Sequence, residues 1–213
     1  MSKEHRGRWA GAEVVCVASG PSLTGEDCEA VRCWREAGDD RRVVAINNTY
    51  QRAPWADVLY SGDLPWWDHY VHCCKAGEWP EFRGERWTQS ALATRRHGIR
   101  WIRAESGEGL RSDRIFTGGN SGYQALQLAV LFGSKRVILL GYDLKKTGGR
   151  GHWHLDHPRE MGNGTRHHVW AQKFDRLAPM LSAAGVEVCN ATRETAIRLI
   201  PRVELGEALG ALV

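Results

Sequence analysis

Six short apolar segments, each followed by small or polar residues, constrain the fold of this chain more than any other feature. Most are rich in β-branched residues, and they cover residues 13–18, 42–46, 57–60, 99–103, 136–140 and 186–189. Stretches with helix start and stop signals separate them at residues 25–37, 121–132 and 167–184. Strands that alternate with helices are typical of a parallel sheet covered on both faces. The sequence therefore predicts an α/β fold, a single Rossmann-like domain over residues 1–213 with a mostly parallel sheet flanked by helices.

Two segments do not fit this alternation. Residues 64–98 begin with a stretch rich in Trp, Pro, His and Cys, and residues 145–166 are polar with many glycines and histidines. We expect both to be inserted or lid segments on the single domain. Trp66 and Trp67 in the first segment either stack on a sugar or base, or cap a small core. The core role is favoured for one of them.

The composition is that of an ordinary globular protein. Hydrophobic residues make up 42% and charged residues 25%, with 29 basic against 25 acidic side chains and a net charge of +4. This balance mildly favours an anionic ligand, although a mixed solvated surface explains it equally well. The six cysteines form no C-x-x-C pair, so buried free thiols are expected rather than a zinc finger.

No apolar run is long enough to cross a membrane, and the first residues lack the apolar core of a signal peptide. We therefore expect a cytoplasmic protein of a bacterium or of a phage-infected host cell. The oligomeric state, including a homo-oligomer, stays open at this stage.

Small or polar residues follow four of the predicted strands. In an open parallel sheet, ligands bind outside the carboxyl ends of the strands. Each of these groups alone is an ordinary turn, because Gly, Asn, Asp and Ser are the common turn formers. Together they favour a binding site built from Ser19-Gly20-Pro21-Ser22, Asn47-Asn48, Ser61-Gly62-Asp63 and Gly141-Tyr142-Asp143.

Two of the glycine-bearing loops lead into predicted helices. Gly20 allows the backbone to approach a ligand closely, and Ser22 offers a hydroxyl group. Residues 118–122 repeat this pattern before the second long helix. Free N–H groups at a helix start bind phosphate well. Two such helix starts at one crevice predict a nucleotide or a diphosphate ligand.

Four potential ligands or bases lie close together in the second inserted segment, namely His152, His154, Asp156 and His157. One interpretation is a lid whose histidines contact phosphate or act as acid or base. A zinc site is a second, and an exposed polar loop is a third. The spacing is not that of a standard zinc motif, so we predict no metal and favour the lid.

Two blocks of the sequence resemble a known family. Residues 14–23, VVCVASGPSL, resemble the G-N-G-P-S-L opening of a family of bacterial sialyltransferases. Residues 120–143, from NSGYQALQLA to LLGYD, resemble that family's later block. Both blocks also occur in the motility-accessory domain linked to flagellin glycosylation and in archaeal 6-hydroxymethylpterin diphosphokinases. Residues 53–63, APWADVLYSGD, are most similar to phage proteins of this group.

The glycine loops and the resemblance together predict the residues of a donor site. Ser19 replaces an asparagine of the family, and Asp63 stands near a second one. Lys145 stands where the family has tyrosines that stabilise the leaving phosphate, and a cation can serve that role by charge. The predicted donor-binding residues are Ser19, Gly20, Ser22, Asn47, Asp63, Asn120, Ser121, Gly122 and Lys145.

The predicted catalytic residues are His154, Asp143 and one of two neighbouring histidines. The resemblance implies a general base just before the last long helix, where His167 and His168 both stand. Asp143 ends the central strand as it does in the family, and His154 belongs to the predicted lid.

The leading hypothesis is an inverting, metal-independent glycosyltransferase that uses a nucleotide-sugar donor and needs no cofactor. The acceptor is a glycan, a protein or a modified nucleic acid. One alternative is an ATP- and Mg²⁺-dependent pyrophosphokinase, with the metal held by Asp63 or Asp143. Another is a non-catalytic, phage-encoded nucleotide-binding protein.

Overall fold

The six predicted strands and one that was not predicted form one sheet of seven parallel strands in the computed structural model, which describes residues 5–75, 81–158, 161 and 166–210. Side chains are described for the same residues except 71–75. The order across the sheet is β5-β4-β3-β2-β1-β8-β9. The strands are β1 (Glu13–Val17), β2 (Arg41–Ile46), β3 (Val58–Tyr60), β4 (Glu85–Thr88), β5 (Arg100–Trp101), β8 (Arg136–Leu140) and β9 (Glu187–Asn190). The predicted Rossmann-like α/β fold is confirmed.

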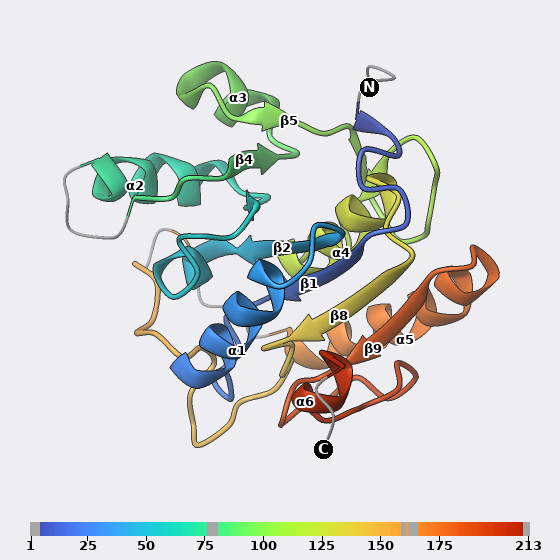
Figure 1. Cartoon of the computed structure of the whole chain (residues 1–213). Coiled ribbons are helices and arrows are strands. Elements are labelled where there is room, and N and C mark those ends of the chain that lie inside the picture. Colours follow the sequence, from blue (N-terminus) through green and yellow to red (C-terminus); the bar gives the residue numbers. More distant parts are fainter. Residues whose placement is uncertain (1–4, 76–80, 159–160, 162–165, 211–213) are drawn as a thin grey trace.

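Helices cover both faces of this sheet (Figure 1). Helices α4 (Ser121–Leu131) and α5 (His167–Ala183) pack on one face. The other face carries α1 (Gly25–Glu36), α2 (Leu64–Lys75), α3 (Ala91–His97) and α6 (Leu205–Ala208). A short 3₁₀ helix, η2 (Asn47–Gln51), follows β2 directly.

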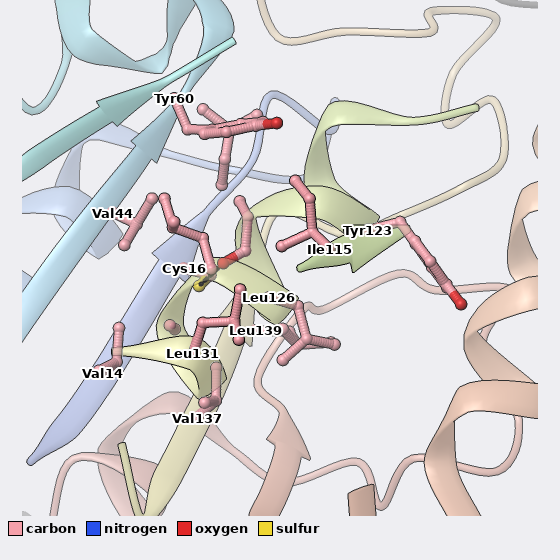
Figure 2. Close-up of a cluster of buried hydrophobic side chains, with 14 of the residues drawn as sticks. Val14, Cys16, Val44, Tyr60, Ile115, Tyr123, Leu126, Leu131, Val137 and Leu139 are labelled. Atoms are coloured by element: carbon pink, nitrogen blue, oxygen red, sulfur yellow. Dashed lines mark hydrogen bonds between the residues drawn. The ribbon is translucent and has the colours of Figure 1, made fainter. Parts of the chain in front are cut away.

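Successive side chains of β1 point alternately into the two cores. Val14 and Cys16 of β1 pack with α4, whereas Val15 and Val17 pack with α1. Figure 2 shows the first of these cores, in which Val14 and Cys16 lie in one cluster with Leu126 and Leu131 of α4. Burial on both faces explains why the strand sequences are continuous apolar runs rather than alternating ones.

The direction of winding reverses beside β1. From β1 the chain adds β2, β3, β4 and β5 on one side, and β8 and β9 form on the other. The switch point therefore lies between β1 and β8, where open parallel sheets bind ligands. The segment after β8 loops beyond the end of that strand, in yellow and orange in Figure 1.

The structure departs from the sequence predictions mainly before α4. Residues 64–98, expected as an inserted segment, contain α2, β4 and α3, and β4 lies in the sheet between β3 and β5. The predicted loop at 103–119 contains a small parallel pair, β6 (Ala104–Glu105) with β7 (Ile115–Phe116). The predicted strand at 99–103 is reduced to the two residues of β5, whose side chains are exposed.

Most of the tryptophan and cysteine side chains considered in the sequence analysis are buried in the core. Trp66 and Trp67 are both buried, and their indole N–H groups donate to Asn48 Oδ1 and to the Ser61 carbonyl oxygen. Neither is available to stack on a ligand. The described cysteines are free thiols, of which Cys33 is exposed and Cys16, Cys28 and Cys189 are buried. The side chains of Cys73 and Cys74 lie outside the described residues.

Candidate functional site

A cavity of about 80 Å³ lies at the carboxyl ends of β1, β2 and β8. The loop after β1, the residue after β2 and the start of α4 supply Ser19, Gly20, Asn47 and residues 120–122. A larger hollow of about 520 Å³ adjoins it and shares Gly151, His152 and His167 with it. The two glycine-bearing loops that are distant in sequence thus line one cavity.

Gly20 is required by a protein contact rather than by an approach to ligand. A Cβ atom at this position would lie 2.7 Å from Asp143 Cγ and would also overlap the Gly141 carbonyl oxygen. The Gly20 N–H donates to that same oxygen at 2.8 Å. The absence of a side chain therefore lets the first loop lie directly against the end of β8.

Asp143 holds this loop in place. Its carboxylate accepts hydrogen bonds from Ser22 N and Ser22 Oγ, both at 3.0 Å, and from Thr147 Oγ1 at 3.3 Å. Asp143 is only 1% exposed, and burial raises the pKa of its carboxyl group despite these bonds. Neither Asp143 nor Ser22 lines the cavity. The geometry gives both residues a positioning role.

The start of α1 does not face the cavity, in contrast to the expectation for the helix after the first loop. Thr24 and Asp27 form a capping box, in which the Thr24 hydroxyl accepts from Asp27 N and the Asp27 carboxylate accepts from Thr24 N. Arg193 pairs with the buried Asp27 carboxylate. None of the residues of α1 lines the cavity.

The start of α4 is arranged differently. Asn120 caps the helix by accepting from Tyr123 N at 3.1 Å. This cap leaves the N–H groups of Ser121 and Gly122, which have no partner within the helix, at the wall of the cavity. The Ser121 hydroxyl oxygen accepts from Gly62 N at 3.2 Å, and its own proton is left to donate. Backbone N–H groups in this position suit a phosphate or carboxylate ligand.

Asn47 combines an unusual backbone with an unused acceptor. Its φ is 51°, in the left-handed region that few residues other than glycine occupy. Its side-chain oxygen is buried and has no hydrogen-bond partner among the described residues. The next residue, Asn48, instead uses its oxygen for Trp66. Strain and an unsatisfied amide together point to a ligand contact at Asn47.

The segment after β8 is attached to the first loop. His152 Nδ1 lies 3.2 Å from Ser19 Oγ, and Trp153 N donates to the Ser19 carbonyl oxygen at 3.1 Å. The guanidinium carbon of Arg52 lies 3.9 Å from the centre of the Trp153 ring. A cation–π contact of this kind contributes about 0.5–2 kcal/mol. These contacts hold His152 at the wall of the cavity.

Three histidines form a tight cluster behind this wall. The ring centres of His152, His154 and His157 lie between 4.8 and 5.4 Å apart, and His157 Nδ1 lies 3.1 Å from Tyr70 Oη. Burial lowers the pKa of His152, and it lowers the pKa of His154 and His157 to about 4 each. All three rings are therefore neutral at pH 7 and offer no positive charge to phosphate.

The structure separates the two candidate bases. His167, the first residue of α5, lines both hollows. Burial, and then the charge of Lys146, lower the pKa of His167, so its imidazole is unprotonated at neutral pH. His168 is exposed and lines neither hollow.

Two predicted donor residues lie apart from the cavity. Asp63 is exposed just before α2 and does not line it. Lys145 pairs with Glu194 at 2.6 Å, whereas its neighbour Lys146 lines the larger hollow. Among the described residues, no group of three or more His, Cys, Asp or Glu is arranged to hold a metal ion.

Trp170 is one of the cavity residues that were missed at the sequence level. Trp170 lines the cavity beside His167, with their ring centres 5.7 Å apart. Residues three apart on a helix share a face, so the position of His167 would have identified Trp170 once α5 was assigned.

The fold is that of a Rossmann-like α/β protein, with a cavity at the switch point of its sheet. Among solved structures, the chain is similar to the MAf glycosyltransferase from Magnetospirillum magneticum AMB-1, with a TM-score of 0.63 and 12% sequence identity over 96% of this chain. This chain spans 34% of the length of that protein. This solved structure therefore adds a likeness of fold to the resemblance in sequence described above.

No protein-family model matches the chain, and no curated protein sequence matches it. None of the described helices is long and apolar enough to cross a lipid bilayer.

Proposed function

We propose that this protein is a glycosyltransferase that takes a nucleotide-activated sugar as donor. One observation carries the proposal: the N–H groups at the start of α4, the unsatisfied Asn47 oxygen and His167 line the same cavity. The cavity of about 80 Å³ accepts a phosphate-sized group. The adjoining hollow of about 520 Å³ falls within the range of small-molecule sites and receives the rest of the substrates.

The donor phosphate binds at the start of α4. Ser121 and Gly122 supply backbone N–H groups, and the Ser121 hydroxyl supplies a further donor. Donors directed at the leaving phosphate stabilise the charge that develops there as the glycosidic bond breaks. Asn47 accepts from a hydroxyl group of the donor beside that phosphate. These contacts support donor binding without a metal ion.

His167 acts as the general base. It removes the proton from the acceptor hydroxyl as that oxygen attacks the anomeric carbon and the nucleotide leaves from the opposite face. The lowered pKa of His167 keeps the imidazole in its unprotonated form at neutral pH. Its place at the junction of the two hollows brings it close to both substrates. A single displacement of this kind inverts the anomeric centre.

The pyrophosphokinase alternative is less well supported. That reaction needs carboxylates to hold Mg²⁺ beside the triphosphate. Asp143 is turned onto Ser22 and Thr147, and Asp63 is exposed outside the cavity. The two carboxylates named for this role therefore do not meet at one site.

A ligand panel tests the proposal. The protein is titrated with nucleotide sugars that carry different bases, and with ATP plus Mg²⁺, in the presence and absence of EDTA. We expect at least one nucleotide sugar to bind and to be hydrolysed slowly in EDTA. Binding of ATP alone, with strict dependence on Mg²⁺, would establish the alternative instead.

A pair of neighbouring variants locates the base. His167→Gln is expected to lower turnover by about 10²–10⁴-fold with little change in donor affinity. His168→Gln removes the same group from the next residue, which is exposed, and is expected to retain wild-type turnover. Equal loss of turnover in both variants would contradict the assignment of His167.

A further inference from the structure

Whereas the cavity described above lies at the carboxyl ends of the strands, a second large hollow lies at their amino ends. Its volume is about 670 Å³, and it is open to solvent and lined mainly by polar groups. It is formed by residues at or just before the amino ends of β2, β3, β4 and β5, together with Arg8 and Trp9. It shares no residue with the cavity at the carboxyl ends of the strands. We refer to it as the arginine groove.

The charges of the groove are strongly unbalanced. Its walls carry two carboxylates, Asp57 and Glu85. Its basic groups, apart from His97, are all arginines rather than lysines, namely Arg8, Arg42, Arg83, Arg86 and Arg100. With five guanidinium groups against two carboxylates, the net charge is +3 with His97 neutral.

Both carboxylates are already engaged. Asp57 accepts a two-bond fork from Arg35, at 2.8 and 2.9 Å, and a further bond from Val43 N. Glu85 accepts the corresponding fork from Arg8, at 2.9 and 3.0 Å. Glu85 also pairs with Arg100 at 3.6 Å, so neither carboxylate is left to neutralise Arg42, Arg83 or Arg86.

Three arginines carry charges that no carboxylate balances among the described residues. Arg42 donates only to the carbonyl oxygens of residues 39 and 41, and Arg86 donates only to that of Phe82. The Arg83 side chain makes no hydrogen bond or ion pair with any described residue. Uncompensated guanidinium groups that line one hollow are typical of an anion site.

The spread of these arginines indicates an elongated anion. Arg42 lies on β2, and Arg83 and Arg86 lie at the start of β4. Two strand spacings of roughly 4.8 Å place the ends of this row about 10 Å apart. A single phosphate does not span that distance, whereas successive phosphates of a chain do. Half-buried Trp55 at the same groove supplies a ring on which a base can stack.

We propose that the arginine groove binds the phosphate backbone of a single-stranded nucleic acid. The guanidinium groups of Arg42, Arg83 and Arg86 contact successive phosphates, and no base is read specifically. This proposal does not depend on the proposed transferase activity, because the two sites share no residue. Binding here would bring a polyanionic partner to the face opposite the donor cavity.

Fluorescence anisotropy with a labelled oligothymidylate of about 12 nucleotides tests the proposal. We expect the wild-type protein to bind at about 50 mM salt and to lose affinity steeply as salt rises. The double variant Arg42→Gln/Arg83→Gln is expected to bind at least tenfold more weakly. The slope of log K against log salt should fall by roughly 1.4 in magnitude, because two phosphate contacts are lost.

A variant with the same charge change serves as control. Arg198→Gln/Arg202→Gln alters two exposed arginines that follow β9, at the other end of the sheet. It is expected to bind as the wild type does. Circular dichroism and thermal unfolding establish that each variant is folded, and the single variant Arg83→Gln removes no side-chain hydrogen bond or ion pair with a described residue.

Several results would overturn the proposal. One is no binding at about 100 μM protein in low salt. Equal weakening in the groove variant and the control would show general attraction by net charge. If a polyglutamate peptide competes as strongly as the unlabelled oligonucleotide does, the groove is assigned to an acidic protein segment instead. Equally strong competition by inorganic triphosphate would assign it to small phosphate ligands.

Discussion

Replacing Gly20 by alanine tests whether the first loop is held against β8 by a close protein contact. The added Cβ would lie 2.7 Å from Asp143 Cγ, closer than real Cβ atoms approach other heavy atoms, and would also overlap the Gly141 carbonyl oxygen. The carbonyl belongs to the backbone at the end of β8 and cannot rotate away. The Asp143 side chain is fixed by its bonds to Ser22 and Thr147. The loop must therefore move, and Asp143 must lose hydrogen bonds.

The expected cost follows from these contacts. Overpacking in a closely packed region costs about 1–3 kcal/mol. Loss of one hydrogen bond to a charged group costs about 1.5–3 kcal/mol, and partial relaxation offsets some of the sum. We expect Gly20→Ala to lower the free energy of unfolding by about 2–4 kcal/mol. For a chain of this length, that corresponds to a fall in Tm of about 4–16 °C.

Gly25→Ala is the matched control. Gly25 is the first residue of α1, and a Cβ there would meet no atom within 4 Å. That substitution is expected to stabilise by about 0.4–1 kcal/mol through the unfolded chain. Urea denaturation of the two variants measures the difference. If Gly20→Ala remains within about 0.5 kcal/mol of wild type, the steric argument is refuted. Loss of donor binding without loss of stability would then assign Gly20 to ligand approach.

Two further predictions concern the histidine cluster and Asn47. The pKa of His154 and His157 is lowered to about 4 by burial, against about 6.5 in an unfolded chain. Their contribution to stability is therefore complete above about pH 6.5 and is lost as the pH falls toward 4. As the pH falls from about 6.5 to 4, the urea midpoint of the wild type should fall more than that of the double variant His154→Gln/His157→Gln. Parallel plots of urea midpoint against pH for the two proteins would contradict this. Because φ of Asn47 is 51°, Asn47→Gly should be more stable than Asn47→Ala by about 1 kcal/mol. Both variants should bind donor about tenfold more weakly through loss of the amide contact, and calorimetry checks this. Equal stability of the two variants would show that the backbone there is unstrained.

Much of the fold follows from patterns that are local in sequence. The strand at 136–140 matches β8, and the helices at 25–37 and 121–132 match α1 and α4 to within one residue at each end. Parallel strands buried on both faces leave continuous apolar runs, which can be recognised without tertiary information. The fold class could therefore be predicted from the alternation of these runs with capped helices.

The missed strand β4 shows where local patterns are insufficient. Its sequence, ERWT, has two charged residues and no run of β-branched ones. It forms because it pairs with β3 on one side and β5 on the other. Tertiary pairing of this kind overrides a weak local propensity. Residues 64–98 therefore looked like an insertion when only their composition was considered.

The site is harder to predict because its decisive contacts join residues far apart in the chain. Gly20 and Gly122 carry the same local signal, and a Cβ at either would meet protein atoms, but of α1 and α4 only α4, which contains Gly122, lines the cavity. Asn47 and Asn48 are adjacent amides, and only the structure shows that Trp66 occupies one of them. Sequence identified the strand ends, but not which polar groups were left for a ligand.

The charge of the cavity wall bears directly on the two candidate reactions. None of the described residues that line the cavity is acidic, whereas its wall includes the open helix start at Ser121. A carboxylate pair would favour a magnesium–triphosphate complex, and backbone N–H groups favour the bare phosphate of a nucleotide sugar. Because Asp143 is bonded to Ser22, its carboxylate does not line the cavity, where it would repel such an anion. Asp143→Asn should therefore weaken the loop, because one of the two acceptor oxygens becomes an NH₂ donor, without converting the cavity into a magnesium site. If donor affinity depends on Mg²⁺ in the wild type but not in Asp143→Asn, Asp143 holds the metal ion and this assignment of its role is wrong.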